Sequence, residues 1–254
     1  AACWIAISRA DRVILAGDHC QLPPTIKCIE AARGGLGRTL LEKVVLHKPE
    51  TVSLLKIQYR MHEDIMRFPS RWFYHDELEA APEVKYRGIL DFDTPVSWID
   101  TSELDLQEKA VAEGTGRLNT GEAELLVREL KNYMERIGIR RILEEHIDFG
   151  VISPYRAQVH YLRHLLKKEP FFRPCRRLIT VHTVDGFQGQ ERDVIMISLV
   201  RANEKGQIGF LRDLRRMNVA ITRARMKLLI LGEAVTLTRH PFYRELYEYI
   251  GGLR

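Results

Sequence analysis

Short runs of β-branched and aliphatic residues alternate along this chain with stretches that carry apolar residues at three- and four-residue steps. Runs of the first kind are typical of buried strands in a parallel sheet, and stretches of the second kind are typical of amphipathic helices. Their alternation predicts an α/β fold, with a parallel sheet that has helices on both faces. We expect strands at residues 12–17, 52–57, 96–99, 149–153, 178–183, 194–200 and 228–231.

The clearest helix is predicted over Gly121–Ile137. Its apolar side chains recur on one face, Asn119 or Thr120 is a suitable N-cap, and Gly138 ends the pattern. By contrast, residues 100–120 are polar and contain several glycines, so they predict a loop.

The size and composition of the chain exclude several classes of protein. With 254 residues, 45% of them hydrophobic, it can form one large or two modest domains and is not a disordered chain. No run approaches the roughly 18 apolar residues of a membrane span, and the first residues lack the order of a secretion signal, so we expect a cytoplasmic or nuclear protein. The net charge of +5 permits a polyanionic partner, and the four cysteines lack the spacing of a zinc module.

A domain boundary is expected near residues 40–55, between a glycine-rich segment and the second predicted strand. We place it after residue 45, which divides the chain into 1–45 and 46–254. The glycine-rich segment 32–39 imitates the end of a phosphate-binding loop, but it has Ala32 for the first glycine and Arg38 for the lysine. It is therefore interpreted as a turn before a helix over Leu40–Leu46.

Four segments place charged or polar side chains just beyond predicted strands, at the edge where open α/β sheets bind ligands. In the first, residues 17–24, Gln21 and Asp18 suit a loop that orients a water or a phosphate oxygen, although an ordinary strand-ending turn has the same composition. In the second, residues 58–62, Tyr59 and Arg60 offer an aromatic face and a fork of donors. A solvated surface arginine would look the same.

The third and fourth segments, residues 183–191 and 218–225, carry weaker local signals. In the third, two glycines let backbone amides approach an anion. In the fourth, Arg223 and Arg225 point to different sides, so one can reach a ligand while the other pairs internally. His160 and His164 have the spacing of a metal pair but lack a Glu-His signature, so no metal site is predicted.

The order of the motifs is more specific than any one of them. GDHCQLPP, QYRMH, SPYRAQ, TVDGFQGQE and NVAITRAR follow one another along the whole chain. Together they closely resemble the later motifs of superfamily 1 helicases, in the branch that contains the nonsense-mediated-decay helicase and immunoglobulin mu-binding protein 2. The resemblance implies two RecA-like domains, with ATP between them and a single nucleic-acid strand across the top. Residues 1–45 would then be the remnant of the first domain and 46–254 the second, in a protein expected to be a monomer.

The resemblance also implies roles for residues that would act on ATP. Gln21 is similar to the glutamine that contacts the γ-phosphate, and Arg60 and Arg223 are similar to the two arginines that the second domain brings to it. These three are the expected catalytic residues, because guanidinium groups offset the charge that spreads over the phosphate oxygens. The expected nucleotide-binding residues are Tyr59, against the adenine, and Gly189 and Glu191, against phosphate and ribose.

A single strand of DNA or RNA is the expected partner. Two triplets follow neighbouring predicted strands, so their hydroxyls and backbone amides can bond successive phosphates without reading the bases. The residues are Ser153, Pro154, Tyr155, Thr183, Val184 and Asp185. Basic side chains such as Arg201, Arg212, Arg215 and Arg216 would add positive charge, although a solvated face would also contain them.

Two helicase elements are absent from the sequence. It contains no GxxxxGK[ST] loop, and no predicted strand ends in the Asp-Glu pair that holds Mg²⁺. We expect the chain to look like the C-terminal motor portion of a longer helicase and to be inactive alone, with Mg²⁺ held mainly by residues outside it. The alternative is a catalytically inactive nucleic-acid-binding module. A two-metal nuclease is disfavoured, because Asp18, Asp185 and Glu191 fall in separate motifs.

Overall fold

A computed structural model describes residues 2–23, 26, 28–111 and 116–253. It divides into two compact units, Ala1–Leu54 and Leu55–Arg254, each described by itself below. The domain boundary predicted after residue 45 stays a prediction, because compactness does not tell which motor domain a residue belongs to.

The first unit consists of short helices joined by irregular segments. They are α1 (Ala2–Ile7), α2 (Ile29–Ala31), η1 (Ala32–Leu36), α3 (Leu40–His47) and η2 (Pro49–Thr51). Thr39 caps α3, since its hydroxyl accepts from the Glu42 amide at 3.1 Å while the Glu42 carboxylate accepts from the Thr39 amide at 2.5 Å. The helix predicted over Leu40–Leu46 is therefore confirmed, and the predicted turn before it contains the short helical segment η1.

The predicted strand at residues 12–17 is wrong. These residues have irregular structure, and Ile14 is 96% exposed. A strand needs a neighbour that completes its backbone hydrogen bonds. No strand lies among the described residues of the first unit, so the apolar run has nothing to pair with.

The second unit is built on a five-stranded parallel sheet. Its strands lie in the order β3 (Val96–Asp100), β9 (Ala224–Gly232), β8 (Arg192–Ser198), β6 (Phe149–Ser153) and β7 (Ile179–Thr183). Each coincides with or overlaps a predicted strand. The predicted strand at 52–57 is reduced to β1 (Ile57–Gln58), which pairs with β2 (Glu79–Ala80) in a separate parallel sheet.

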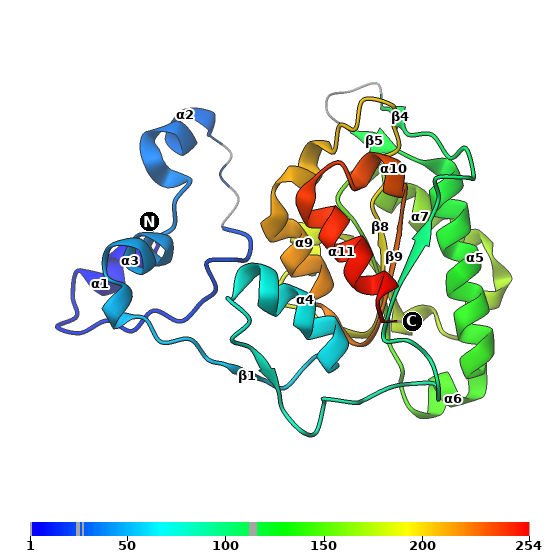
Figure 1. Cartoon of the computed structure of the whole chain (residues 1–254), viewed down its shortest axis with the longest axis horizontal. Helices are drawn as coiled ribbons and strands as arrows, with labels where there is room; N and C mark the ends of the chain where they lie inside the picture. Colours follow the sequence, from blue (N-terminus) through cyan, green and yellow to red (C-terminus); the bar gives the residue numbers. More distant parts are fainter. Residues whose placement is uncertain (1, 24–25, 27, 112–115, 254) are drawn as a thin grey trace. The chain divides into compact units, whose positions relative to one another are not determined.

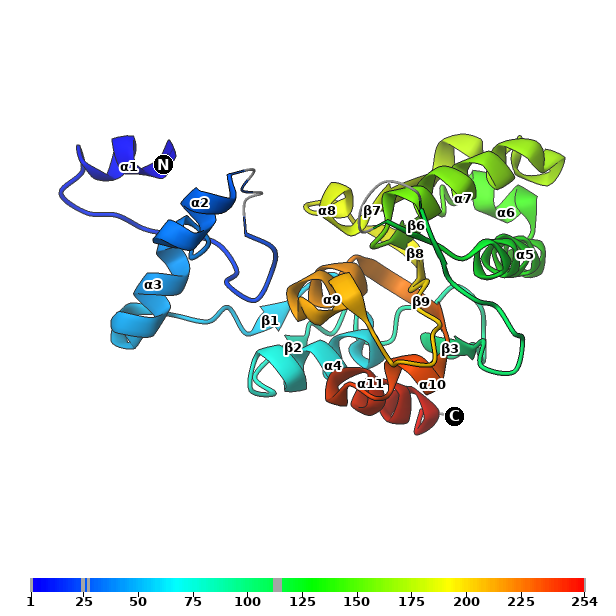
Figure 2. The same cartoon turned by 90° about the horizontal axis from the view of Figure 1, so that it is seen from above.

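Helices cover both faces of this sheet (Figures 1 and 2). One face carries α5 (Thr120–Ile137), α6 (Ile139–Glu144) and α7 (Arg156–Lys168), and the other carries α4 (Glu63–Phe73), α8 (Val184–Phe187), α9 (Leu214–Ile221), α10 (Ala234–Leu237) and α11 (Pro241–Gly251). Short helical turns η3 (Pro170–Phe172), η4 (Arg176–Leu178) and η5 (Gly209–Arg212) lie between them. The α/β fold class, with a parallel sheet between two helical layers, is confirmed.

The helix predicted over Gly121–Ile137 forms with its predicted ends. The Asn119 side chain accepts from the Glu122 amide at 3.0 Å, and Gly138 ends the helix with a φ of +88°. The region predicted as a loop contains a small antiparallel pair, β4 (Lys109–Ala110) with β5 (Arg117–Leu118). Residues 112–115, which belong to the same predicted loop, lie outside the described residues.

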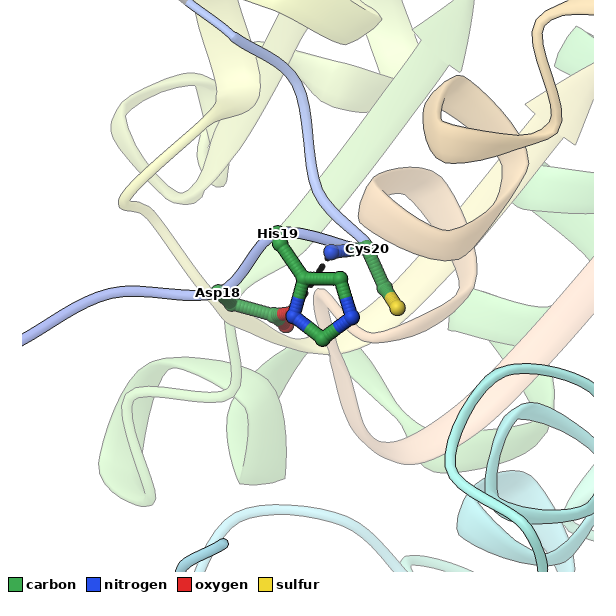
Figure 3. Close-up of side chains that lie close together, drawn as sticks. All are labelled: Asp18, His19 and Cys20. Atoms are coloured by element: carbon green, nitrogen blue, oxygen red, sulfur yellow. Dashed lines mark hydrogen bonds between the residues drawn. The ribbon is translucent and has the colours of Figure 1, made fainter. Parts of the chain in front are cut away.

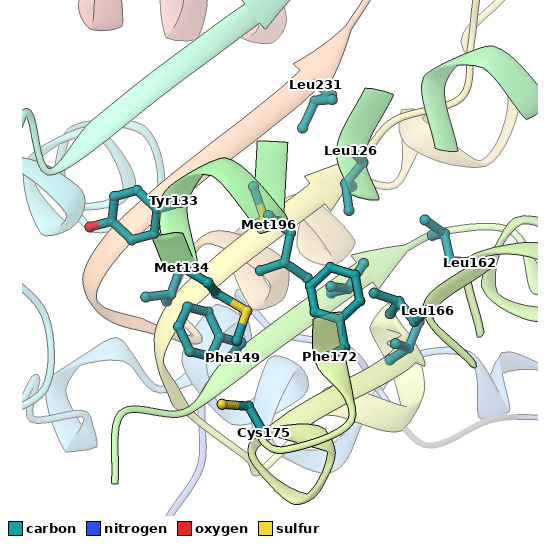
Figure 4. Close-up of a cluster of buried hydrophobic side chains, with 14 of the residues drawn as sticks. Leu126, Tyr133, Met134, Phe149, Leu162, Leu166, Phe172, Cys175, Met196 and Leu231 are labelled. Atoms are coloured by element: carbon teal, nitrogen blue, oxygen red, sulfur yellow. The ribbon is translucent and has the colours of Figure 1, made fainter. Parts of the chain in front are cut away.

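The main hydrophobic core lies between the sheet and the α5–α7 layer. Figure 4 shows Leu126 and Met134 of α5 beside Phe149 of β6, Met196 of β8 and Leu162 of α7, all buried. Burying side chains of this size stabilises the fold by about 1.5–3 kcal/mol each. This packing fixes the strand ends from which the candidate site residues emerge. Among the described residues, no helix is long and apolar enough to cross a membrane.

Candidate nucleotide and nucleic-acid sites

The candidate residues of the second unit lie at two different edges of the main sheet. Ser153 and Thr183 end β6 and β7, at the carboxyl edge. Glu191 comes directly before β8 and Arg223 directly before β9, at the amino edge. The prediction that every segment follows the carboxyl end of a strand is therefore wrong for residues 218–225, and it is also wrong for residues 17–24, because the strand predicted before them does not form. Residues 218–225 form the end of α9 and the start of β9, because Val219, among other apolar residues of this segment, is buried as part of a packed helix.

Arg60 and Glu191 meet at the amino edge although 131 residues separate them. The Arg60 Nε donates to the Glu191 carboxylate, and its Nη1 donates to the Thr222 carbonyl at 3.0 Å. The two side chains are 33% and 41% exposed. Arg60 is thus oriented by the fold while about a third of its side chain remains exposed.

Arg223 lies beside this pair but is only 2% exposed. Its Nε donates to the Val219 carbonyl at 3.0 Å, its Nη1 to the Gln190 carbonyl at 3.2 Å, and its Nη2 to the Thr222 hydroxyl at 3.0 Å. The guanidinium group is therefore held by neutral oxygens next to Glu191.

Arg225 forms ion pairs inside the second unit, as predicted for one of the two arginines of this segment. Its guanidinium lies 3.0 Å from the Asp148 carboxylate and 3.2 Å from that of Asp193. Burial of Asp193 and its proximity to Asp148 raise the pKa of the Asp193 carboxyl, although Arg225 acts in the opposite direction. Arg225 therefore holds the amino ends of the strands together.

Tyr59 and Gly189 remain accessible at the surface of the second unit. Gln58 closes the turn that contains Tyr59, because its side-chain oxygen accepts from the backbone amides of Arg60 at 2.9 Å and Met61 at 2.7 Å. Tyr59 is left 67% exposed, with its ring available for packing against a planar group. Gly189 has a φ of +81°, a conformation that a side chain would disfavour.

The turn that contains Gln21 belongs to the first unit. Asp18 organises it, because one carboxylate oxygen accepts from Gln21 Nε2 at 2.7 Å and the other from the Cys20 amide at 2.9 Å. Pro24, predicted to end this loop, lies outside the described residues.

Asp18, His19 and Cys20 place three potential metal-ligand atoms within 4.8 Å of one another (Figure 3). Burial and the charges of Asp18 and Glu42 raise the pKa of the Cys20 thiol to about 11. Both carboxylate oxygens of Asp18 already accept hydrogen bonds within the turn. The chemistry of this cluster favours a hydrogen-bonded turn over a metal site.

The carboxyl edge buries half of the residues expected to bind nucleic acid. Ser153 is 0% exposed and Tyr155 is 2% exposed, and Val184 is buried as well. Their buried side chains pack beneath the carboxyl edge and do not form its surface. Its surface is formed instead by Pro154 and Thr183, which are partly exposed, and by Asp185, which is exposed.

One of the two glycines of the third segment, Gly186, has a packing role. A Cβ at Gly186 would lie 1.8 Å from Nδ1 of His182, so this glycine allows α8 to pack against the end of β7. The Thr183 hydroxyl accepts from the Gly186 amide at 3.4 Å and caps this short helix.

Comparison with known proteins assigns the chain to a family. Residues 36–235 match a family model described as an AAA domain, and residues 1–28 match a second model with the same description. The chain belongs to the AAA domain family. One relative is DNA-binding protein SMUBP-2 of Rattus norvegicus, which is 36% identical over 98% of this chain and 25% of its own length. Another is an uncharacterized ATP-dependent helicase of Methanocaldococcus jannaschii, which is 37% identical over 97% of this chain and 36% of its own length.

A regulator of nonsense transcripts 1 homolog of Drosophila melanogaster is 35% identical over 94% of this chain and 20% of its own length. These relatives confirm the resemblance to superfamily 1 helicases. The AAA domain chain spans only about a fifth to a third of their lengths. Among solved structures, the C-terminal domain of a possible DNA helicase from Lactobacillus plantarum matches at 12% identity over 69% of this chain and 88% of that one, with a TM-score of 0.38. A structural similarity with so low a TM-score adds nothing to the family assignment.

Proposed function

We propose that this chain is the second motor portion of an ATP-dependent superfamily 1 helicase, with ATP at the amino edge of the sheet and a single strand of DNA or RNA at the carboxyl edge. The observation that carries the proposal is the cluster of Arg60, Glu191 and Arg223, three residues from three separate motifs. A domain that only binds nucleic acid has no need to gather two arginines away from its binding edge.

The chemistry of the cluster fits a nucleotide. Two guanidinium groups stand near a carboxylate that could accept from ribose hydroxyls, and the exposed ring of Tyr59 could pack against a base. Bound ATP would supply the γ-phosphate, and Arg60 and Arg223 would offset the negative charge that develops on it. The expected γ-phosphate contact of Gln21 belongs to the same proposal.

The proposal includes Mg²⁺ as a cofactor that is held mainly by residues outside this chain. The sequence has neither the phosphate-binding loop nor the strand-terminal Asp-Glu pair that would hold the ion. We therefore expect the chain alone not to hydrolyse ATP. The cytoplasmic or nuclear location and the monomeric state remain predictions.

A phosphate-release assay on the purified chain, with and without single-stranded DNA, tests this part directly. We expect no release above the background of a heat-denatured sample. Turnover that the Arg223→Ala substitution removes would contradict it, because the active site would then be complete within these residues.

The burial of Arg223 favours a second candidate, a nucleic-acid-binding module without turnover. In that case Arg223 would be a structural residue, and its loss would affect folding only. The two candidates differ in a longer protein that joins this chain to a domain with a phosphate-binding loop. In a motor, Arg223→Ala strongly lowers ATP turnover, whereas a protein that contains only a binding module has no turnover for the substitution to lower.

A further inference from the structure

The loop between β8 and α9 leaves the carboxyl edge of the sheet through a strained residue. Val200 has a φ of +70°, which is rare for a β-branched side chain and costs about 1–3 kcal/mol. Buried groups hold it there, since Val200 N donates to the Glu122 carboxylate at 2.8 Å and its carbonyl accepts from Asn119 Nδ2 at 3.4 Å. Strain of this kind persists only where the surrounding structure determines it, so these buried groups determine how the loop begins.

The loop presents one aromatic side chain to solvent. Phe210 in η5 is 43% exposed, although Ile208 and Leu211 on either side are 3% and 1% exposed and anchor the loop to the core. The exposed ring is therefore flanked by two buried side chains. A ring held in this way loses little conformational freedom when a ligand packs on it.

The contacts of Phe210 connect it to the expected strand-binding residues. Its ring lies 5.7 Å from that of buried Tyr155, at an angle of 64°. Gly209, with a φ of +55°, permits this approach, because a Cβ there would lie 2.8 Å from Arg201 Nη1 and 3.0 Å from the Tyr155 hydroxyl. Phe210 therefore extends the surface formed after β6.

A guanidinium group supports the same ring. The Arg216 guanidinium carbon lies 5.6 Å from the centre of the Phe210 ring. Arg216 also lies 3.2 Å from the Asp213 carboxylate and 4.0 Å from that of Asp185, the exposed residue of α8. Phe210 and Asp185 are thus linked through one arginine at the carboxyl edge.

The charge around Phe210 indicates what packs on it. Residues 201–216 contain five basic side chains against two acidic ones. Arg201 is buried and paired with Glu108, and Arg215 and Arg216 pair with Asp213, whereas Arg212 beside Phe210 is exposed. Exposed Arg156 follows Tyr155 directly. An aromatic ring among basic side chains suits a polyanion whose units carry flat rings, which is a single nucleic-acid strand.

We propose that Phe210, supported by Tyr155 and Arg216, is a platform on which one base of a bound single strand stacks. The proposal rests on the proposed function, since it adds a base contact to the phosphate contacts expected at the carboxyl edge. Because every base has a flat face, such a contact holds the strand without reading its sequence.

The test is a fluorescence-anisotropy titration of the whole chain with labelled oligothymidine and with an abasic strand of the same length and charge. We expect Phe210→Ala to weaken binding of oligothymidine about tenfold. Phe210→Trp should preserve binding, and the salt dependence of Phe210→Ala should match that of the unchanged chain, because no phosphate contact is lost. On the abasic strand, Phe210→Ala and the unchanged chain should bind equally.

Two further variants serve as controls. Phe210→Leu keeps the apolar contact with Tyr155 but removes the flat face, so it should bind as weakly as Phe210→Ala while melting at the temperature of the unchanged chain. Phe92→Ala removes a fully exposed ring before β3 and should leave binding unchanged. Equal affinity of Phe210→Ala and the unchanged chain for oligothymidine overturns the platform alone. Failure of the unchanged chain to bind either strand overturns the proposed strand site and the platform together.

Discussion

The two edges of the main sheet hold their functional groups in different ways. At the amino edge, charges are fixed by other protein groups, with Arg60 against Glu191 and Arg223 on three oxygens. At the carboxyl edge, the buried residues give shape, while Thr183 and Phe210 remain available at the surface. The difference indicates two kinds of ligand. Groups that stabilise a reacting phosphate must be held in fixed positions. A surface that binds a moving strand needs only contacts that do not depend on the base sequence.

The largest expected effect is at the amino edge. In a longer protein that supplies a phosphate-binding loop, Arg223→Ala should lower ATP turnover by about 10²-fold or more, because a donor to the transition state is lost. Arg223→Lys should restore little, since an ammonium group lacks the planar fork. Steady-state phosphate release at saturating ATP measures both. Turnover within a factor of two of the unchanged protein would show that Arg223 is only structural.

Glu122 lies fully buried behind the carboxyl edge. Burial raises the pKa of its carboxyl group to about 7. Its Oε1 accepts from the Ser198 hydroxyl at 2.6 Å and from the Val200 amide, while Oε2 is buried without a hydrogen-bond partner. The folded chain therefore binds a proton that the unfolded chain releases above its ordinary pKa near 4.5. Stability from this group is fully present below that value and is lost as the pH rises to about 7.

Glu122→Gln should remove this pH dependence. For the unchanged chain, the free energy of unfolding should fall by up to about 1.4 kcal/mol per pH unit between pH 5 and 7 from this one group. Urea unfolding at several pH values measures the slope, and the slope of Glu122→Gln should be smaller by that amount. If the free energy of unfolding changed equally with pH in both proteins, the pH dependence would come from a group other than Glu122.

A smaller effect is expected for Thr183 at the surface of the carboxyl edge. Thr183→Ala should weaken binding of a single strand about fivefold, the effect of one lost hydrogen bond of about 1 kcal/mol. Thr183→Ser keeps the hydroxyl and should bind normally. Thr238→Ala, which removes a hydroxyl bonded to the Ala234 carbonyl in α10, is the matched control for stability. Unchanged affinity of Thr183→Ala would remove this residue from the strand site.

The smallest effect on stability is expected for Glu191→Gln. Because both members of the Arg60–Glu191 pair are about a third or more exposed, breaking the pair should change the melting temperature by only about 2 °C. In the longer protein, however, the KM for ATP should rise a few-fold through loss of the expected ribose contact. Glu77→Gln, which breaks an exposed pair with Lys56, should affect neither. A large loss of stability would make the pair a structural element.

Local sequence signals predicted the elements whose structure depends on neighbouring residues. The ends of α5 follow from Asn119 and Gly138, and the strands of the main sheet follow from apolar runs that this sheet buries. The same signal failed at residues 12–17, because a strand also depends on a partner that the run itself does not specify.

The candidate sites could be predicted only as separate motifs. Nothing local to Arg60 indicates that Glu191 will lie against it, and nothing in the SPY motif indicates that Ser153 and Tyr155 will be buried. The edge at which Arg223 lies depends on whether α9 or a loop precedes it. Phe210 was missed for the same reason, since a single aromatic residue in a loop is indistinguishable from a core residue until the burial of its neighbours is known.

The most direct test of two separate edges is the affinity of Arg223→Ala for a labelled single strand without nucleotide, compared with Thr183→Ala at the same salt concentration. Thermal melting first confirms that both variants are folded, because Arg223→Ala loses buried hydrogen bonds. The account predicts an affinity for Arg223→Ala within about twofold of the unchanged chain and a clear loss for Thr183→Ala. Abolished strand binding by folded Arg223→Ala would contradict it, because the buried arginine would then belong to the strand site.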